Sequence, residues 1–333
     1  MVCVNIHVRL ESLVRAMARL GLAALLCATG LAHAQQFPSK PLRIVVGFAS
    51  GTTVDVLGRL LGPKLAEAFQ QQVIVENITG ASSTIAAGNL ARAPADGHTL
   101  MLTSTALVTS PSLFRKLAFD LDKDFAPVAL LAYVHNVLVI RADSPARDIA
   151  GLIALSRAQP GKYSYASSGT GSAGHLATEL FKSMAKVELL EVPYKANTQA
   201  LTDVVSGEVL VFYPSLPSAL PLIQAGRLRG LAVSGRARSA AAPDIPAMAE
   251  SLPGYEASAQ FGVIVPAGTP RNAIVALNRE FLKSLQMPDV RKSMAGQGLE
   301  PASSTPEEFG RQMQEGRQKW ERLIRQLGIK PQD

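Results

Sequence analysis

The stretch LRIVVGFASGTTVD, residues 42–55, joins an apolar run to a small-residue turn and the start of a helix. Residues 42–48 are short and almost wholly apolar, as is typical of a buried strand. After the turn, apolar residues recur at helical spacing, namely Val56, Leu57, Leu60, Leu61, Leu65 and Phe69. That spacing predicts a helix with one buried face, and Pro63 inside it predicts a kink. The stretch therefore indicates a strand, a turn and a helix in succession.

The same alternation continues along the chain. Further short apolar runs that predict strands lie at 73–76, 99–103, 163–166, 189–192, 209–213, 228–233 and 261–265. Helices are expected to begin near His175, at Thr269-Pro270 and at the capping box Thr305–Glu308, with Pro306 at the first helical position. The apolar positions of these three helices predict core packing, namely Leu176, Leu180, Met184, Ile274, Leu277, Phe281, Leu285, Phe309, Met313, Trp320 and Ile324. Alternation of this kind predicts an α/β fold with parallel strands, and 333 residues are enough for two lobes.

The N-terminus has the pattern of an export signal. Three arginines precede an apolar run at 20–31, and Ala32-His33-Ala34 is typical of a signal-peptidase site. We therefore expect residues 1–34 to be a signal peptide, with Met17 as an alternative start, and the mature protein to begin at Gln35. A buried N-terminal helix is the alternative interpretation. Both cysteines of the chain lie within this segment, so the mature protein is expected to have no thiol chemistry.

Composition excludes several classes of protein. Charged residues make up 18% of the chain and apolar residues 47%, which argues against a disordered chain. The net charge of +7 is scattered and does not indicate nucleic-acid binding. The sequence has no H-E-x-x-H, C-x-x-C, P-loop or G-x-S-x-G pattern. We therefore expect no metal, no cofactor and no nucleic-acid partner.

Three small-residue loops follow predicted strands and precede predicted helices. They lie at 48–55, 103–105 and 167–175, and hydroxyl and glycine residues dominate them. Parallel strands bring such turns to one edge of a sheet, where helix N-termini offer unpaired N–H groups to an anion. Each loop alone is ordinary turn chemistry, but three at successive strand ends predict a site for a small carboxylate.

Two enzymatic interpretations remain open at this point. Gly169, Gly171 and Gly174 form a G-x-G-x-x-G pattern between a strand and a helix, and Glu188 or Glu191 could serve as the ribose-binding acid of a dinucleotide site. An exported hydrolase could instead use Ser168 or Ser172. Asp55 is interpreted most simply as a helix N-cap, and His175 could bond either a loop carbonyl or a ligand.

Several short stretches, in their order and spacing, carry a resemblance to a known family. They are Val75–Asn77, Ala95–Leu100, Asp124–Val128, Val192–Lys195, Leu216–Pro221, Pro253–Tyr255 and Pro266–Pro270. With these, the sequence from Phe37 to Pro331 resembles the Bug solute receptors, the TctC-like extracytoplasmic binding proteins of tripartite tricarboxylate transporters.

The resemblance implies a type II periplasmic-binding-protein fold, with two α/β lobes joined by two crossing strands near 137–141 and 260–265. Lobe 1 would comprise 35–139 and 261–333, and lobe 2 would comprise 140–260. A small organic anion would bind in the cleft between them, and closure would bury it. The resemblance implies a periplasmic monomer that performs no chemistry and that delivers its ligand to membrane transporter subunits. A role in sensing, without a dedicated transporter, is the alternative.

The resemblance also implies ligand contacts, which are carried over residue by residue. Phe48, Gly51 and Asp55 keep the spacing of the family's first loop, but Ala49, Ser50 and Thr52 replace two prolines and a glycine. Tyr213-Pro214-Ser215 stands where the family often has an aspartate, which favours a plain carboxylate, aromatic ones included, over an amino acid. The residues expected to contact the ligand are Phe48, Ser50, Gly51, Thr52, Asp55, Ser104, Thr105, Ser167, Ser168, Gly169, Gly171, Ser172, His175, Tyr194, Lys195, Tyr213 and Ser215.

Overall fold

The computed structural model describes residues 37–167, 169, 172–194 and 196–331. The predicted export signal therefore lies outside the described residues, as do the candidate ligand contacts Ser168, Gly171 and Lys195. The fold described below belongs to the compact unit that begins at Lys40. Within the described part of the chain, no helix combines the length and the apolar character needed to cross a membrane.

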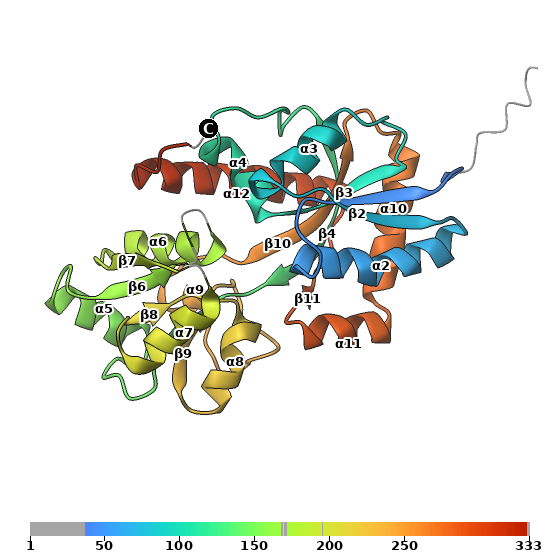
Figure 1. The fold of residues 1–333 in the computed structure, drawn as a ribbon. Coiled ribbons are helices and arrows are strands. Elements are labelled where there is room, and N and C mark those ends of the chain that lie inside the picture. Colours follow the sequence, from blue (N-terminus) through green and yellow to red (C-terminus); the bar gives the residue numbers. More distant parts are fainter. Residues whose placement is uncertain (1–36, 168, 170–171, 195, 332–333) are drawn as a thin grey trace, which may run out of the picture. The chain divides into compact units, whose positions relative to one another are not determined.

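Strands and helices alternate along the chain, which confirms the predicted α/β class (Figure 1). The strands are β1 (Leu42–Val46), β2 (Val73–Asn77), β3 (Thr99–Ser104), β4 (Phe125–Val134), β5 (Val137–Arg141), β6 (Ser164–Ser167), β7 (Leu190–Pro193), β8 (Val211–Phe212), β9 (Leu228–Val233), β10 (Ala259–Pro266) and β11 (Glu300–Pro301). The helices are α2 (Thr53–Phe69), α3 (Thr84–Ala91), α4 (Thr105–Leu113), α5 (Ile149–Ala158), α6 (Ala173–Ala185), α7 (Asn197–Ser206), α8 (Leu216–Gln224), α9 (Met248–Ser251), α10 (Arg271–Leu285), α11 (Pro288–Gly296) and α12 (Pro306–Gln326), with a 3₁₀ turn, η2, at Ala81–Ser83.

The strands form two separate sheets. The first sheet has the order β11-β4-β10-β3-β1-β2, and the second has the order β7-β6-β8-β5-β9. In the first sheet, β1 is parallel to both β2 and β3. In the second sheet, β6 is parallel to β7 and β8. The helices that follow β1, β3 and β6 therefore begin at carboxyl ends of parallel strands, as the sequence predicts.

The chain passes between the two sheets twice. It leaves the first sheet after β4 and enters the second at β5, with only His135 and Asn136 between them. It returns to the first sheet at β10, which pairs antiparallel with both β3 and β4. The predicted crossing segment 137–141 coincides with β5, which pairs wholly within the second sheet.

Each sheet is covered on its faces by buried apolar residues. Along β5, Leu138 and Ile140 belong to one core of the second sheet, while Val137 and Val139 belong to the core on its other face. Successive side chains of a strand point to opposite faces, so this alternation is what a doubly covered strand requires. Continuous apolar runs such as β5 are therefore explained by burial on both sides.

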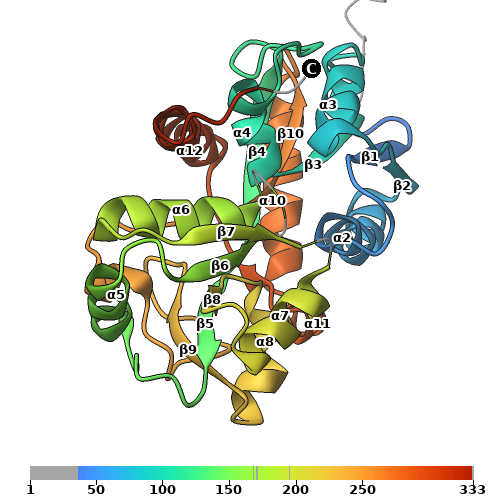
Figure 2. The same cartoon turned by 60° about the vertical axis from the view of Figure 1, so that its left-hand side comes forward.

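The long helix α12 contributes to the cores of both sheets. Phe309 and Met313, near its start, pack in the core of the first sheet. Trp320, Leu323 and Ile324, near its end, pack in a core of the second sheet. The predicted capping box is confirmed, because Thr305 Oγ1 accepts from the N–H of Glu308 at 3.1 Å and the Glu308 carboxylate accepts from the N–H of Thr305 at 2.8 Å. The helix lies beside α4 and α6 and so links the two sheets (Figure 2).

Pro63, where the sequence predicts a kink, does not end its helix. The helix α2 continues from Thr53 to Phe69 with Pro63 inside it. Proline removes the hydrogen bond to the carbonyl of Arg59, four residues earlier. Both Pro63 and Arg59 lie on the exposed side of the helix, where water can satisfy that carbonyl. The apolar stripe on the opposite side supplies the packing that keeps the helix intact.

Candidate functional site

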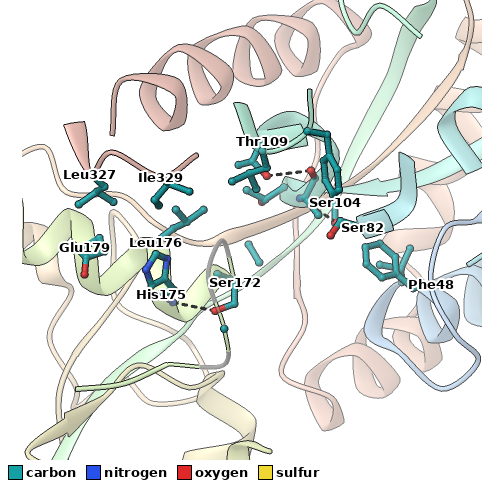
Figure 3. A pocket seen from close by; sticks show the side chains of 18 of the residues that line it. Phe48, Ser82, Ser104, Thr109, Ser172, His175, Leu176, Glu179, Leu327 and Ile329 are labelled. Atoms are coloured by element: carbon teal, nitrogen blue, oxygen red, sulfur yellow. Dashed lines mark hydrogen bonds between the residues drawn. The ribbon is translucent and has the colours of Figure 1, made fainter. Parts of the chain in front are cut away.

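A cavity of about 860 Å³ opens where the helices of the two sheets face one another (Figure 3). Its walls come from the first turns of α2, α4 and α6, from the turn η2, from β10 and from the segment that follows α12. This volume lies within the roughly 300–1,000 Å³ that is usual for small-molecule sites. The cavity is therefore large enough for an organic ligand rather than for a simple ion alone.

The first sheet presents two helix N-termini to the cavity. Thr52, Thr53 and Val54 line it from α2, and Ser104 and Thr105 line it from α4. The first N–H groups of a helix have no acceptor within the helix, and they carry a partial positive charge. β1 and β3 are parallel neighbours, so the two N-termini emerge on the same side of the sheet.

The second sheet presents a third helix N-terminus. Ser172 caps α6, because its Oγ accepts from the N–H of His175 at 3.3 Å. Ser172 and Ala173 line the cavity together with Gly169, whose φ of +101° places it in the left-handed region that favours glycine. Three helix N-termini thus border one cavity, which is the arrangement expected for an anion site.

Helix α6 is held close to the strand β8 by the absence of a side chain at Gly174. A Cβ atom there would lie 2.5 Å from the carbonyl oxygen of Tyr213, which accepts from Asn136 Nδ2 at 2.8 Å. We expect Gly174→Ala to lower the free energy of unfolding by about 1–3 kcal/mol, because the helix must shift. Urea unfolding monitored by circular dichroism measures this loss.

The matched control for Gly174→Ala is the same substitution in α12. At Gly316 a Cβ atom would meet only the side chain of Val108, at an ordinary 3.5 Å. Alanine is the better helix former, so Gly316→Ala should raise the free energy of unfolding by up to about 1 kcal/mol. Equal effects of the two substitutions would contradict the close approach of α6 to Tyr213.

Asp55 is not the N-cap of α2, contrary to the sequence interpretation. Thr52 occupies the cap position, and Asp55 lies in the first turn with 1% of its surface exposed. Its carboxylate accepts from the N–H of Gly51 at 2.8 Å, from Asn77 Nδ2 at 2.8 Å and from Arg59 Nε at 3.0 Å. Burial alone would raise the pKa of Asp55, but these hydrogen bonds outweigh it and hold the pKa well below its ordinary value.

Asp55 therefore fixes the conformation of the first loop without lining the cavity itself. Because its carboxylate also accepts from Ser50 Oγ at 3.3 Å, it ties Ser50 and Gly51 toward α2. Phe48 and Thr52, on either side of these residues, are the members of the loop that line the cavity. The loop keeps a defined conformation although alanine and serine replace the two prolines expected from the resemblance.

The second sheet also brings two carboxylates and a histidine to the cavity. Glu179 accepts from the hydroxyl of Tyr165 at 2.5 Å and from Lys182 Nζ at 2.6 Å. Glu191 accepts from Ser167 Oγ at 2.5 Å, and its other oxygen lies 3.8 Å from His175 Nε2. Burial lowers the pKa of His175, although both carboxylates act in the opposite direction. The lowered pKa favours the neutral form of the His175 imidazole.

Seven of the predicted contact residues line the cavity together. They are Phe48, Thr52, Ser104, Thr105, Gly169, Ser172 and His175. Seven other described candidates are not among its lining residues, namely Ser50, Gly51, Asp55, Ser167, Tyr194, Tyr213 and Ser215. Ser168, Gly171 and Lys195 lie outside the described residues. Ligand contact itself stays a prediction for every member of the set.

Three of the candidates away from the cavity, Tyr194, Ser167 and Ser215, bond to other side chains instead. The Tyr194 hydroxyl donates to Asp203 at 2.7 Å, and Ser167 Oγ donates to Glu191. Tyr213 is fully buried. The hydroxyl of Ser215 donates to Ser218 Oγ at 3.1 Å. The absence of an acid at 213–215 therefore says little about the ligand, because Tyr213 and Ser215 do not line the cavity.

Sequence reasoning did not assign several lining residues to the site. Ser82 is brought in by η2, where Ala81, Ser82 and Ser83 all have positive φ. Leu113 and Phe114 come from the end of α4, and Leu327 to Lys330 come from the end of the described chain. A run of small residues at 79–84 is a sequence signal for the turn that carries Ser82. The other lining residues have no local sequence signal that relates them to the site.

Comparison with known proteins gives one family. The family model described as "Tripartite tricarboxylate transporter family receptor" matches residues 57–329. A UPF0065 protein from the tcbD-tcbE intergenic region of Pseudomonas sp. (strain P51) is 38% identical over 312 residues, which cover 93% of each chain. Protein BugT of Bordetella pertussis is 33% identical over 300 residues, covering 89% of this chain and 92% of BugT.

Solved structures give the same result. The structure of R. palustris Rpa4515 with adipate superposes with a TM-score of 0.72 at 34% identity. The match covers 89% of this chain and all of that chain. The similarity therefore extends over most of the chain.

Proposed function

Since this chain belongs to the tripartite tricarboxylate transporter family receptors, we propose that it is a periplasmic solute receptor that captures one small carboxylate in the cavity between its two sheets. The observation that carries the proposal is the meeting of three helix N-termini, those of α2, α4 and α6, at one cavity. Hydrogen bonds to charged groups contribute about 1.5–3 kcal/mol each, so a few of them support micromolar binding.

Family membership confirms the resemblance to Bug receptors and the periplasmic-binding-protein fold. It also decides between a receptor and an enzyme, because the matched family consists of transporter receptors. The dinucleotide and hydrolase interpretations gain no support from it. Gly169 and Ser172, on which those interpretations depend, have a sufficient role in forming the N-terminus of α6 at the cavity.

The proposed mechanism is capture by closure. The lobe built on the first sheet holds the carboxylate at α2 and α4, and the lobe built on the second sheet closes with α6. The boundaries proposed for these lobes are 35–139 with 261–333, and 140–260. Export through cleavage after Ala34, a monomeric receptor and delivery to membrane transporter subunits complete the proposal. The Rpa4515 structure with adipate supports a carboxylate ligand.

The test is native mass spectrometry of gently purified mature protein, followed by thermal denaturation with a panel of carboxylates. We expect one organic acid per chain, released on denaturation. A carboxylate at 100 times its Kd stabilises the folded state by about 2.7 kcal/mol, which corresponds to a rise in Tm of roughly 4 °C for a chain of about 300 residues. A bound dinucleotide, or a Tm that no carboxylate raises, would contradict the proposal.

A further inference from the structure

The segment that follows α12 forms part of the cavity wall. Leu327, Gly328, Ile329 and Lys330 all line the cavity, although they follow a helix that begins in the core of the first sheet. We call residues 327–330 the C-terminal wall. Figure 3 places Leu327 and Ile329 beside Leu176, on the side of the cavity away from Ser82 and Ser104.

The conformation of the C-terminal wall is fixed by hydrogen bonds. The N–H of Ile329 donates to the carbonyl of Ile324 at 3.2 Å, and the N–H of Gly328 donates to that of Arg325 at 3.1 Å. With Gly328 at a φ of +64°, this is a Schellman motif that ends α12. Beyond it, Arg115 Nε donates to the carbonyl of Pro331 at 3.2 Å. The wall is thus anchored both to α12 and to the loop after α4.

The side chains of the wall belong to an apolar cluster. Leu113, Leu327 and Ile329 pack partly buried against the core that includes Leu176. Phe114 lines the cavity next to Leu113. Each of Leu113, Leu327 and Ile329 is only partly covered, so an apolar ligand group placed there would remove further apolar surface from water.

Charges near this end do not favour a second ligand carboxylate. Glu191 and Glu179 both line the cavity, and burial lowers the pKa of His175, which disfavours the cationic form that would offset these two acids. Glu179 is paired with Lys182. Among the described lining residues, Lys330 is the only cation, and its side chain is exposed. Exposed ion pairs contribute little binding energy. The attraction of Lys330 for a second carboxylate of the ligand would therefore only weakly offset the repulsion by Glu179 and Glu191.

We propose that the C-terminal wall, with Leu113, Phe114 and Leu176, forms a subsite for the hydrocarbon part of the ligand, so that this receptor prefers a monocarboxylate with an apolar body to a short dicarboxylate. The inference rests on the proposed function, because the helix N-termini must hold the single carboxylate. It gives α12 and its end a role in ligand selection.

The test compares the binding of three probes, 3-phenylpropionate, propionate and adipate, by isothermal titration calorimetry. For a probe that binds too weakly for direct titration, the affinity is measured by competition with a tighter-binding probe. The first two share a carboxylate and differ in apolar body, while adipate carries a second carboxylate. We expect 3-phenylpropionate to bind the wild type at least about tenfold more tightly than either of the others. Its heat capacity change should be the most negative, because it buries the most apolar surface.

Variants of the wall separate the subsite from the carboxylate site. Leu327→Ala/Ile329→Ala should weaken 3-phenylpropionate binding at least about tenfold and leave propionate within about twofold. Leu113→Ala, which leaves α12 intact, should act in the same direction and covers the case in which the double variant does not fold. Val275→Ala, on the exposed side of α10, is the matched control and should change neither affinity.

The possible results distinguish the two proposals. Equal losses for propionate and 3-phenylpropionate in the wall variants would overturn the subsite while leaving a carboxylate receptor in place. Tighter binding of adipate than of 3-phenylpropionate, lost in Lys330→Ala, would also overturn it and would assign a second carboxylate to Lys330. Failure of all three probes and of the wider carboxylate panel to bind the wild type would overturn the proposed function and this inference with it.

Discussion

Replacing Ala106 with glutamate is expected to lower the affinity for any carboxylate ligand at least about 100-fold, which is about 2.7 kcal/mol. Ala106 lies in the first turn of α4 and lines the cavity. A glutamate there would place its own carboxylate at the helix N-terminus and repel the carboxylate of the ligand. Calorimetric titration with the best ligand of the carboxylate panel measures the loss.

The fold should survive this change, because an acidic side chain is favourable near a helix N-terminus. Ala106→Gln has nearly the same shape without the charge and should lower the affinity by only about tenfold. Asn272→Glu adds the same charge to the exposed first turn of α10, which does not line the cavity, and should leave binding unchanged. A carboxylate that still binds the Ala106→Glu variant with near wild-type affinity does not sit at α4.

Replacing Asp55 with alanine is expected to lower the free energy of unfolding by about 2–4 kcal/mol at pH 7. The carboxylate is almost wholly buried, and its loss leaves the N–H of Gly51, the amide of Asn77 and the guanidinium of Arg59 without this acceptor. Loosening of the loop that carries Phe48 and Thr52 should weaken ligand binding as well. Urea denaturation at a series of pH values measures the stability.

The pH dependence follows from the lowered pKa of Asp55. An aspartate whose pKa is lowered in the folded state stabilises it fully above the unfolded value of 3.8, and this contribution is lost as the pH falls below that value. The stability gap between wild type and Asp55→Ala should therefore narrow below about pH 4.

Asp289→Ala is the matched control for Asp55→Ala. Asp289 also lies in the first turn of a helix and also pairs with a cation, Lys64, at 2.7 Å, but its side chain is 63% exposed. We expect the loss of Asp289 to lower the free energy of unfolding far less than the loss of Asp55 does, because solvent screens an exposed ion pair. Two results would contradict a stabilising role for the buried Asp55 carboxylate. One is that the two substitutions lower the free energy of unfolding equally. The other is that the difference in this free energy between wild type and Asp55→Ala stays constant down to pH 3.

Much of the fold was predictable because its elements carry local signals. The strand predicted at 228–233 coincides with β9, and the capping box marks the first turn of α12. The strand β4 was not predicted, although it lies between β10 and β11 in the first sheet. Its Pro127 argues against a central strand, since proline cannot donate to the ladder. The structure accommodates it at a register shift, where Pro127 faces Ile264.

The part of the site that depends on strand order could be predicted from the sequence. Parallel strands bring the turns after β1 and β3 together, so Phe48, Thr52 and Ser104 could be placed at one edge from the pattern alone. The C-terminal wall could not, because the path of α12 across both cores decides where it lies. In the sequence, Leu327 and Ile329 only continue the apolar pattern of a helix, and no local feature relates them to Leu176.

The passage of α12 through both cores also gives the protein an internal optical reporter. Trp320 is the only tryptophan in the chain, and it is 5% exposed where α12 meets the core of the second sheet. Lys319 Nζ lies 4.3 Å from the centre of its ring. If the proposed closure moves one lobe against the other, we expect the surroundings of this indole to change. Its fluorescence emission would then follow ligand-driven closure in real time without a dye.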